Sequence, residues 1–244
     1  DLGFNNPVAI SDSVTLEFFE AGHILGAASA RLTITEDNKV RRIGFTGDLG
    51  NYNSKLVPDP MPMPDLEYLI SEGTYGGRKH ESSGKAEEEL LHHIFKTCVE
   101  KNGKLVIPAF SVGRTQAILF TLNQHYQQKT LPEIPVFTDS PLAIKSTSVY
   151  QENLIYLNEE ARNFTQKHHQ TFAFPYLNVV EDERESEYIS TLPEPAIIVS
   201  AAGMVEGGRI QMHVRNNISN PDNTILIAGF CAEGTLGHRL LQGQ

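Results

Sequence analysis

The first part of the chain has the pattern of short β-strands. Apolar and polar residues partly alternate, which predicts strands at residues 14–19, 28–35 and 41–46. Asp37 and Asn38 favour a turn between the last two of these strands. A connection with prolines at positions 58, 60, 62 and 64 follows, and a further strand is predicted at 68–71.

From residue 83 the pattern changes to strands that alternate with helices. Ser83 is a candidate N-cap of a helix with one apolar face, and Asn102-Gly103 ends that helix. Beyond it we expect strands at 105–108, 136–138, around 179, 196–200 and 224–227, and helices at 115–127, 142–150, 185–191 and 208–217. Alternation of this kind predicts a largely parallel sheet with helices on both faces. A domain boundary is predicted at Gly76-Gly77.

Composition and charge narrow the classes of protein. The 244 residues carry a net charge of −10, which disfavours a surface coated in basic charge but allows a local basic groove. No apolar run approaches the roughly 20 residues of a membrane span, and no signal peptide is visible, so we expect no membrane partner. Two distant cysteines, Cys98 and Cys231, are predicted to be buried free thiols in a reducing cytoplasm.

Three side chains with metal-binding or acid–base chemistry lie at predicted strand ends. His23 follows Ala-Gly after the first strand, Asp48 lies in the glycine-flanked phrase after the third, and Glu72 ends the strand at 68–71. Imidazole and carboxylate groups beside glycines, which leave room for a substrate, suit a zinc-dependent hydrolase. Taken singly, each also has an ordinary interpretation as a hydrogen-bonding, turn or capping residue.

Two later segments, 108–114 and 200–209, each lead from a strand into a helix. Both place small residues and free backbone N–H groups at a helix N-terminus beside an arginine. This arrangement suits an anion such as phosphate, although ordinary turn chemistry is equally compatible. Because parallel sheets bind ligands at the carboxyl ends of their strands, both segments are expected at a binding edge.

Seven phrases then occur in one order along the chain. They are Ala-Gly-His-Ile-Leu-Gly-Ala (21–27), Thr-Gly-Asp-Leu-Gly (46–50), Glu-Gly-Thr-Tyr-Gly (72–76), Pro-Ala-Phe-Ser-Val-Gly-Arg-Thr-Gln (108–116), Thr-Asp-Ser-Pro-Leu-Ala (138–143), Ser-Ala-Ala-Gly-Met-Val-Glu-Gly-Gly-Arg (200–209) and Ala-Gly-Phe-Cys-Ala-Glu-Gly-Thr-Leu-Gly (228–237). In these phrases the chain resembles the metallo-β-lactamase/β-CASP nucleases. It is most similar to bacterial and archaeal relatives of the endonuclease subunit of the mRNA 3′-end cleavage complex. The resemblance covers residues 14–244.

The resemblance implies a fold and an activity. The fold is α/β, with a partial αββα lactamase domain at residues 1–76 and a β-CASP domain with a mainly parallel sheet at 77–244. The activity is hydrolysis of single-stranded RNA at a cleft between the two domains, where two zinc ions activate a bridging water for in-line attack on a phosphodiester.

The same resemblance implies roles for particular residues. His23 matches a zinc ligand, Asp48 matches the ligand that bridges the two metals, and Glu72 matches an acid that supports the catalytic histidine network. Two further segments match the parts of the family's cleft that face the RNA backbone. They contain Ser111, Arg114, Ser200 and Gly203.

The chain also departs from the family pattern. The His-x-His-x-Asp-His signature is absent and is expected upstream of Asp1, and two later motif histidines are expected beyond Gln244. Gly73 stands where a hydroxyl residue is usual, and neither His213 nor His238 has the context of a motif histidine. We therefore expect the middle of such an enzyme, with only part of its site.

Other functions remain open from the sequence. One is a non-catalytic RNA-binding or scaffold homologue of the same fold, against which the presence of His23, Asp48 and Glu72 counts. Another is a DNA-directed β-CASP nuclease, because no residue visibly reads the 2′-OH that distinguishes RNA. A small-molecule hydrolase is disfavoured by the β-CASP phrases, and a homo-oligomer is left open.

Overall fold

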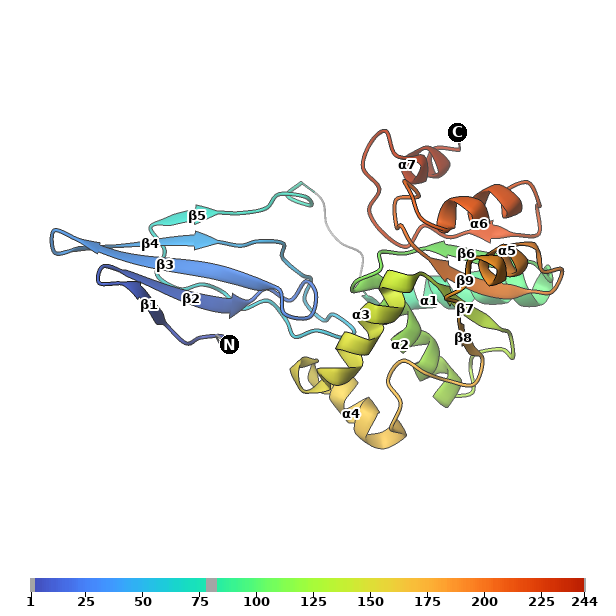
Figure 1. The fold of residues 1–244 in the computed structure, drawn as a ribbon, viewed down its shortest axis with the longest axis horizontal. Helices are drawn as coiled ribbons and strands as arrows, with labels where there is room; N and C mark the ends of the chain where they lie inside the picture. The colour runs from blue at the N-terminus through green and yellow to red at the C-terminus, as the bar shows by residue number, and fades with distance from the viewer. Residues whose placement is uncertain (1–2, 78–82, 244) are drawn as a thin grey trace. The chain divides into compact units, whose positions relative to one another are not determined.

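The computed structural model describes residues 3–77 and 83–243 (Figure 1). Its contacts divide the chain into two compact units. The first comprises Asp1–Ser83 with Leu154–Asn163, and the second comprises Gly84–Asn153 with Phe164–Gln244. The boundary at residue 77 stays a prediction of the sequence; by contacts, the first segment of the first unit ends at Ser83.

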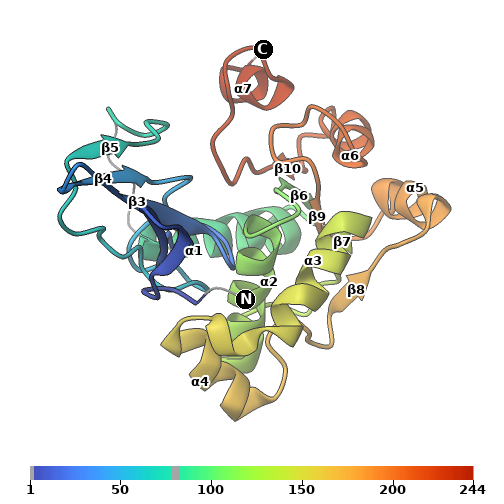
Figure 2. The ribbon, with the colours of Figure 1, turned by 60° about the vertical axis from the view of Figure 1, so that its left-hand side comes forward.

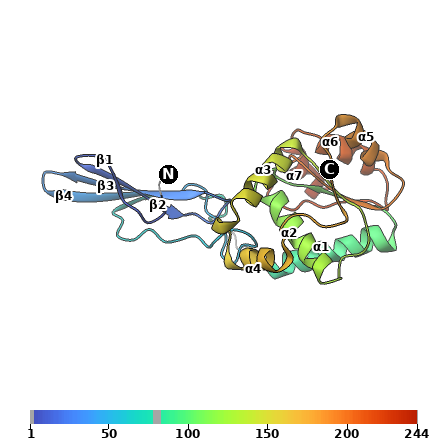
Figure 3. The ribbon, with the colours of Figure 1, turned by 60° about the horizontal axis from the view of Figure 1, so that its bottom comes forward.

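The first unit is built on a five-stranded sheet in the order β1-β2-β3-β4-β5. Its strands are β1 (Val8–Ser11), β2 (Val14–Glu20), β3 (Ala28–Glu36), β4 (Lys39–Phe45) and β5 (Tyr68–Ile70). Strands β1 to β4 pair antiparallel, as Figure 3 shows, while β5 is parallel to β4. Consequently β2, β4 and β5 run in the same direction, and the chain leaves all three at one edge of the sheet.

The predicted turn between β3 and β4 is confirmed. Asp37 and Asn38 both have positive φ, 48° and 58°, as a two-residue hairpin of type I′ requires. Short polar side chains tolerate this backbone better than other non-glycine residues, which is why the pair marks the turn.

The second unit contains a fully parallel five-stranded sheet in the order β10-β6-β9-β7-β8. Its strands are β6 (Lys104–Pro108), β7 (Val136–Asp139), β8 (Leu177–Val179), β9 (Ala196–Ser200) and β10 (Thr224–Ile225). The α-helices that follow β5 in the described residues are α1 (Ser83–Ile94), α2 (Arg114–Gln127), α3 (Pro141–Glu152), α4 (Glu159–His168), α5 (Glu183–Thr191), α6 (Ile210–Asn217) and α7 (Leu236–Leu241). The α/β fold class with a parallel sheet and flanking helices is therefore confirmed.

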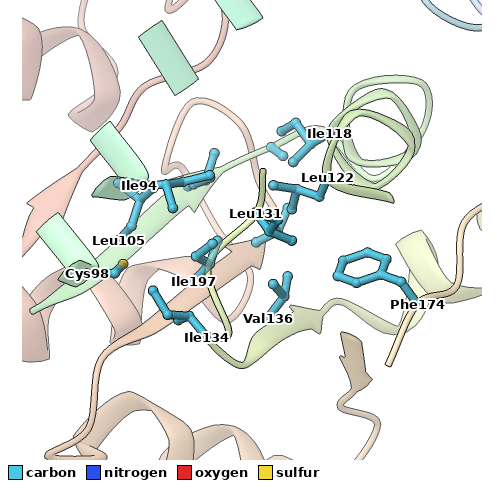
Figure 4. Close-up of a cluster of buried hydrophobic side chains, with 13 residues drawn as sticks. Ile94, Cys98, Leu105, Ile118, Leu122, Leu131, Ile134, Val136, Phe174 and Ile197 are labelled. Carbon is cyan, nitrogen blue, oxygen red and sulfur yellow. The ribbon is translucent and has the colours of Figure 1, made fainter. Parts of the chain in front are cut away.

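Alternate residues of the central strands point to two separate hydrophobic clusters. Figure 4 shows the first, in which α1 and α2 pack on one face of the sheet with Leu105, Ile107, Ile197 and Val199. The neighbouring strand residues Val106 and Ile198 belong to the second cluster, with side chains of α5 and α6. In Figure 2, α1 and α2 lie on one side of β6 and β9, and α5 and α6 lie on the other. Strands covered on both faces explain the continuous apolar runs in the sequence.

Some elements were not predicted, and one prediction lies outside the described residues. Strand β1 and helix α7 are short, and the apolar residues of α4 are Ala161 and Phe164 alone, so these segments offer few apolar positions from which to predict an element. Helix α1 continues into a π-helix, Phe95–Glu100, before ending at Asn102-Gly103 as predicted. The capping role predicted for the side chain of Ser83 lies outside the described residues.

Two further sequence predictions can be compared with the structure. Cys98 and Cys231 are buried free thiols, as predicted, and burial raises the pKa of Cys98 to about 11. Within the described parts of the chain, no helix combines the length and the apolar character that a membrane span requires.

Candidate functional site

The first candidate site lies at the edge where β2, β4 and β5 end, because His23, Asp48 and Glu72 follow these three strands. Backbone contacts draw the first two loops together. The Gly50 N–H donates to the Ala21 carbonyl at 2.8 Å. A Cβ at Gly50 would lie 1.6 Å from the carbonyl oxygen of Gly22, so only glycine allows this approach.

Glu72 connects the third loop to the one that carries Asp48. Its carboxylate accepts the backbone N–H groups of Leu49 and Thr74, each at 3.0 Å, and its own N–H donates to Thr46 Oγ1 at 3.0 Å. The Leu49 N–H, followed by the bonds from Thr74, holds the pKa of Glu72 below its usual value, and the nearby His23 contributes in the same direction. The structure thus brings all three predicted residues to one edge.

An additional acid, Glu20, was not predicted to belong to this edge. It is buried at the end of β2, and its Oε1 accepts the N–H of Gly22 at 2.9 Å. Burial raises its pKa, opposed by hydrogen bonds from the backbone of Gly22 and Ala21. Its position directly before the phrase Ala-Gly-His is the only sequence signal for this supporting role.

The donor set at this edge fits a zinc site only in part. The side chains of His23 and Asp48 are exposed, and they offer one imidazole and one carboxylate. A catalytic zinc ion usually takes three protein ligands and a water molecule. Among residues 3–77 and 83–243 there is no group of three or more His, Cys, Asp or Glu side chains placed to hold a metal. The zinc site therefore stays a prediction that needs further ligands.

The second candidate site lies in the second unit, where the loop after β6 enters α2. Gly113 precedes the helix with φ of 81°, and its N–H donates to Gln116 Oε1 at 2.7 Å. Gln116 is fully buried, and its amide also donates to the Ser111 carbonyl at 3.1 Å and to Thr147 Oγ1 at 2.9 Å. Gln116 thereby fixes the loop, while Arg114 is exposed at the first turn of α2.

The loop after β9 contacts the loop after β6. Gly203 is buried, and a Cβ there would lie 2.9 Å from Cδ2 of the Phe110 ring. Ser200 is also buried, and its Oγ donates to the Asp139 carbonyl at 2.7 Å. The structure therefore brings Ser111, Arg114, Ser200 and Gly203 to one edge, with only Arg114 and the half-buried Ser111 offering side chains to solvent.

Behind these loops lies a buried polar cluster that the sequence did not reveal. Asp139, fully buried at the end of β7, accepts hydrogen bonds from Arg209 Nη1 at 2.6 Å, His213 Nε2 at 2.6 Å and Ser186 Oγ at 2.5 Å. Burial alone would raise the pKa of Asp139, but the bonds from His213, Ser186 and Arg209 outweigh it and hold the pKa below its usual value. An acid in Thr-Asp-Ser-Pro at a strand end was the available signal.

Comparison with known proteins identifies the family. The family described as the Beta-Casp domain matches residues 115–240, which is more than half of the chain. This chain belongs to the β-CASP family. The predicted family resemblance is confirmed.

Three relatives illustrate the match. The chain is 32% identical over 229 residues to Ribonuclease TTHA0252 of Thermus thermophilus, covering 94% of this chain and 52% of that protein. It is 33% identical over 237 residues to an RNase J-like protein of Methanocaldococcus jannaschii, covering 96% and 53%. It is 30% identical over 245 residues to Transcription termination factor FttA of Methanosarcina mazei, covering 99% and 38%. The chain spans about half the length, or less, of these curated relatives.

The β-CASP match covers the loop after β9 and the buried cluster around Asp139. Ser111 and Arg114 lie just before its first residue, whereas His23, Asp48 and Glu72 lie in the first unit, outside it. The roles of all these residues stay predictions, because family membership assigns none of them individually.

Proposed function

We propose that the protein containing this chain is a zinc-dependent ribonuclease that hydrolyses phosphodiester bonds of single-stranded RNA. The observation that carries the proposal is the convergence of the His23, Asp48 and Glu72 loops at one sheet edge in a β-CASP chain. Two relatives named as a ribonuclease and an RNase J-like protein support the same class of reaction.

Within this proposal each residue has a defined task. His23 and Asp48 would hold metal together with ligands from outside this chain, and bound zinc supplies a Lewis acid and a nucleophilic water at neutral pH. Glu72, kept ionised by two backbone N–H groups, orients the loop that carries Asp48. Arg114, at the N-terminus of α2, and Ser111 would bind an RNA phosphate.

The deciding experiment compares Asp48→Ala with Asp12→Ala in the full-length protein. Asp48→Ala should reduce cleavage of a labelled single-stranded RNA by about 100-fold or more, since it removes a metal ligand. Asp12, in the β1–β2 turn of the same sheet, is exposed and serves as the matched control, with activity within about twofold of the parent. Zinc added back after chelation should restore the parent activity but not that of Asp48→Ala. Retained metal-dependent cleavage by Asp48→Ala would contradict the proposal.

The scaffold alternative makes a different prediction in the same assay. Because the described residues supply only part of a metal site, a homologue that binds RNA without cutting it remains a second candidate. Such a protein would bind the labelled RNA with equal affinity before and after chelation and would leave it intact at any zinc concentration. Single-stranded DNA of the same sequence, run in parallel, distinguishes a DNA-directed enzyme.

A further inference from the structure

The residues Asp139 and Ser140 join several segments at the carboxyl edge of the parallel sheet. The Asp139 carboxylate receives donors from α5 and from the start and body of α6, and its carbonyl receives Ser200 Oγ from the end of β9. Ser140 caps α3 by accepting the Ala143 N–H at 3.2 Å, and its Oγ lies 3.2 Å from Ser111 Oγ. One dipeptide thus touches both loops of the second candidate site.

Two arginines at this edge, Arg209 and Arg114, differ in whether their guanidinium groups are available to contact a ligand. Arg209 Nη1 donates to Asp139 Oδ1 at 2.6 Å and to the Val180 carbonyl at 3.3 Å, and its Nη2 donates to the Glu181 carbonyl at 2.7 Å. Its guanidinium therefore links the ends of β7 and β8 to the start of α6. In contrast, Arg114 is exposed, and its side chain has no ion pair with the described residues.

A contribution to stability alone is a weak explanation for the buried cluster around Asp139. A buried ion pair often contributes little net stability, because desolvation offsets the attraction. In addition, His213 is fully buried, and its Nδ1 has no hydrogen-bond partner among the described residues. What such a cluster does provide is a single geometry, since each donor to Asp139 comes from a fixed direction.

We propose that Asp139 is a positioning residue for RNA binding. Its carboxylate draws Arg209 inward and its backbone carbonyl holds Ser200, while the adjacent Ser140 contacts Ser111. Together these bonds fix the loops at 109–114 and 200–209 so that Arg114 and Ser111 face an RNA phosphate. The inference rests on the proposed ribonuclease function and deepens it. It assigns the phosphate contact to Arg114 and an internal task to Arg209 and Ser200.

The test measures the Kd of a fluorescein-labelled single-stranded RNA, together with kcat and KM, in the full-length protein. Asp139→Asn should raise Kd and KM by about 10-fold and leave kcat at saturating RNA within about threefold. Arg209→Lys should have the same effect, because it keeps the charge but loses the planar fork. Asn123→Ala is the matched control: Asn123 is fully buried in α2 and donates to the Gln170 and Thr171 carbonyls, so its loss destabilises the same unit and should leave Kd unchanged.

A double-mutant cycle with Arg114→Gln separates positioning from general destabilisation. If Asp139 acts by presenting Arg114, the Kd of the double variant should be about equal to the higher Kd of the two single variants. If the two act independently, the losses should multiply to within about twofold. Independent losses, an unchanged Kd for Asp139→Asn, or an equal loss for Asn123→Ala would each overturn the inference.

Two further comparisons cover a variant that does not fold and a parent protein that does not bind RNA. Should Asp139→Asn fail to fold, Ser186→Ala removes one of the three donors and should raise Kd in the same direction by a smaller factor. If the parent protein does not bind RNA, the proposed function fails and this inference fails with it. If the parent binds RNA and the variants bind equally well, only this inference fails.

Discussion

Among single residues, Glu72 shows how an acid near the protein surface can be kept ionised and oriented. Both carboxylate oxygens accept backbone N–H groups, from Leu49 on one side and Thr74 on the other. Folding lowers the pKa of Glu72, so the folded protein stabilises the ionised carboxylate more than the unfolded chain does. The contribution of Glu72 to stability should therefore depend on pH in a definite direction.

Replacing Glu72 by Gln tests this dependence. At pH 5 to 7 the variant should be less stable than the parent, because the amide has only one oxygen to accept two N–H groups. As pH falls below 4.5, the ordinary pKa of Glu, the carboxylate protonates first in the unfolded chain and the difference should shrink, vanishing below the lowered pKa of the folded protein. Urea unfolding from pH 7 to pH 3 measures the difference, with the exposed Glu36→Gln as control. A difference that is constant over this range would count against the assigned hydrogen bonds.

At the scale of elements, local pattern explains most of what the sequence predicted correctly. The continuous apolar runs of β6 and β9 are buried on both faces, and the turn at Asp37-Asn38 has the required backbone. The sequence placed His23, Asp48 and Glu72 at strand ends, and the resemblance grouped them; their common edge comes from the pairing that runs β2, β4 and β5 in one direction. The cluster on Asp139 could not be predicted, since its partners Ser186 and His213 lie 47 and 74 positions away in sequence and only packing brings them together.

The close approach of two loops at Gly50 leads to a prediction at the same scale. Gly50→Ala would place a Cβ 1.6 Å from the Gly22 oxygen, and a backbone clash cannot be relieved by a rotamer change, so the loops of His23 and Asp48 must separate. We expect unfolding free energy to fall by more than about 1 kcal/mol and RNA cleavage to fall with it. Gly73→Ala, where no atom lies within 4 Å, is the control and should change stability by less than about 0.5 kcal/mol. Urea unfolding and the cleavage assay report the two effects, and equal behaviour of both variants would refute the argument.

For the chain as a whole, charge sets a limit on how it would bind RNA under the proposed function. The net charge of −10 on these 244 residues repels a polyanion at long range, so under the proposed function affinity would come from a few local cations rather than from a general basic surface. Of the two arginines in the loops at 109–114 and 200–209, Arg209 makes internal hydrogen bonds and Arg114 is exposed to solvent. The salt dependence of binding should therefore respond to the position of a removed charge, not to the change in net charge.

Arg114→Gln and Arg184→Gln change the net charge equally and so make a matched pair. Arg184 is exposed in the first turn of α5 and has no assigned RNA contact. Each phosphate contact to single-stranded RNA contributes about −0.7 to the slope of log K against log salt concentration, so Arg114→Gln should reduce the magnitude of that slope by about 0.7. Arg184→Gln should leave the slope unchanged and shift affinity only slightly, through the long-range field. Titrations of labelled RNA between about 50 and 200 mM salt measure both slopes. Equal slopes for the two variants would mean that Arg114 makes no phosphate contact, and the presentation of Arg114 by the Asp139 cluster would then lose its purpose.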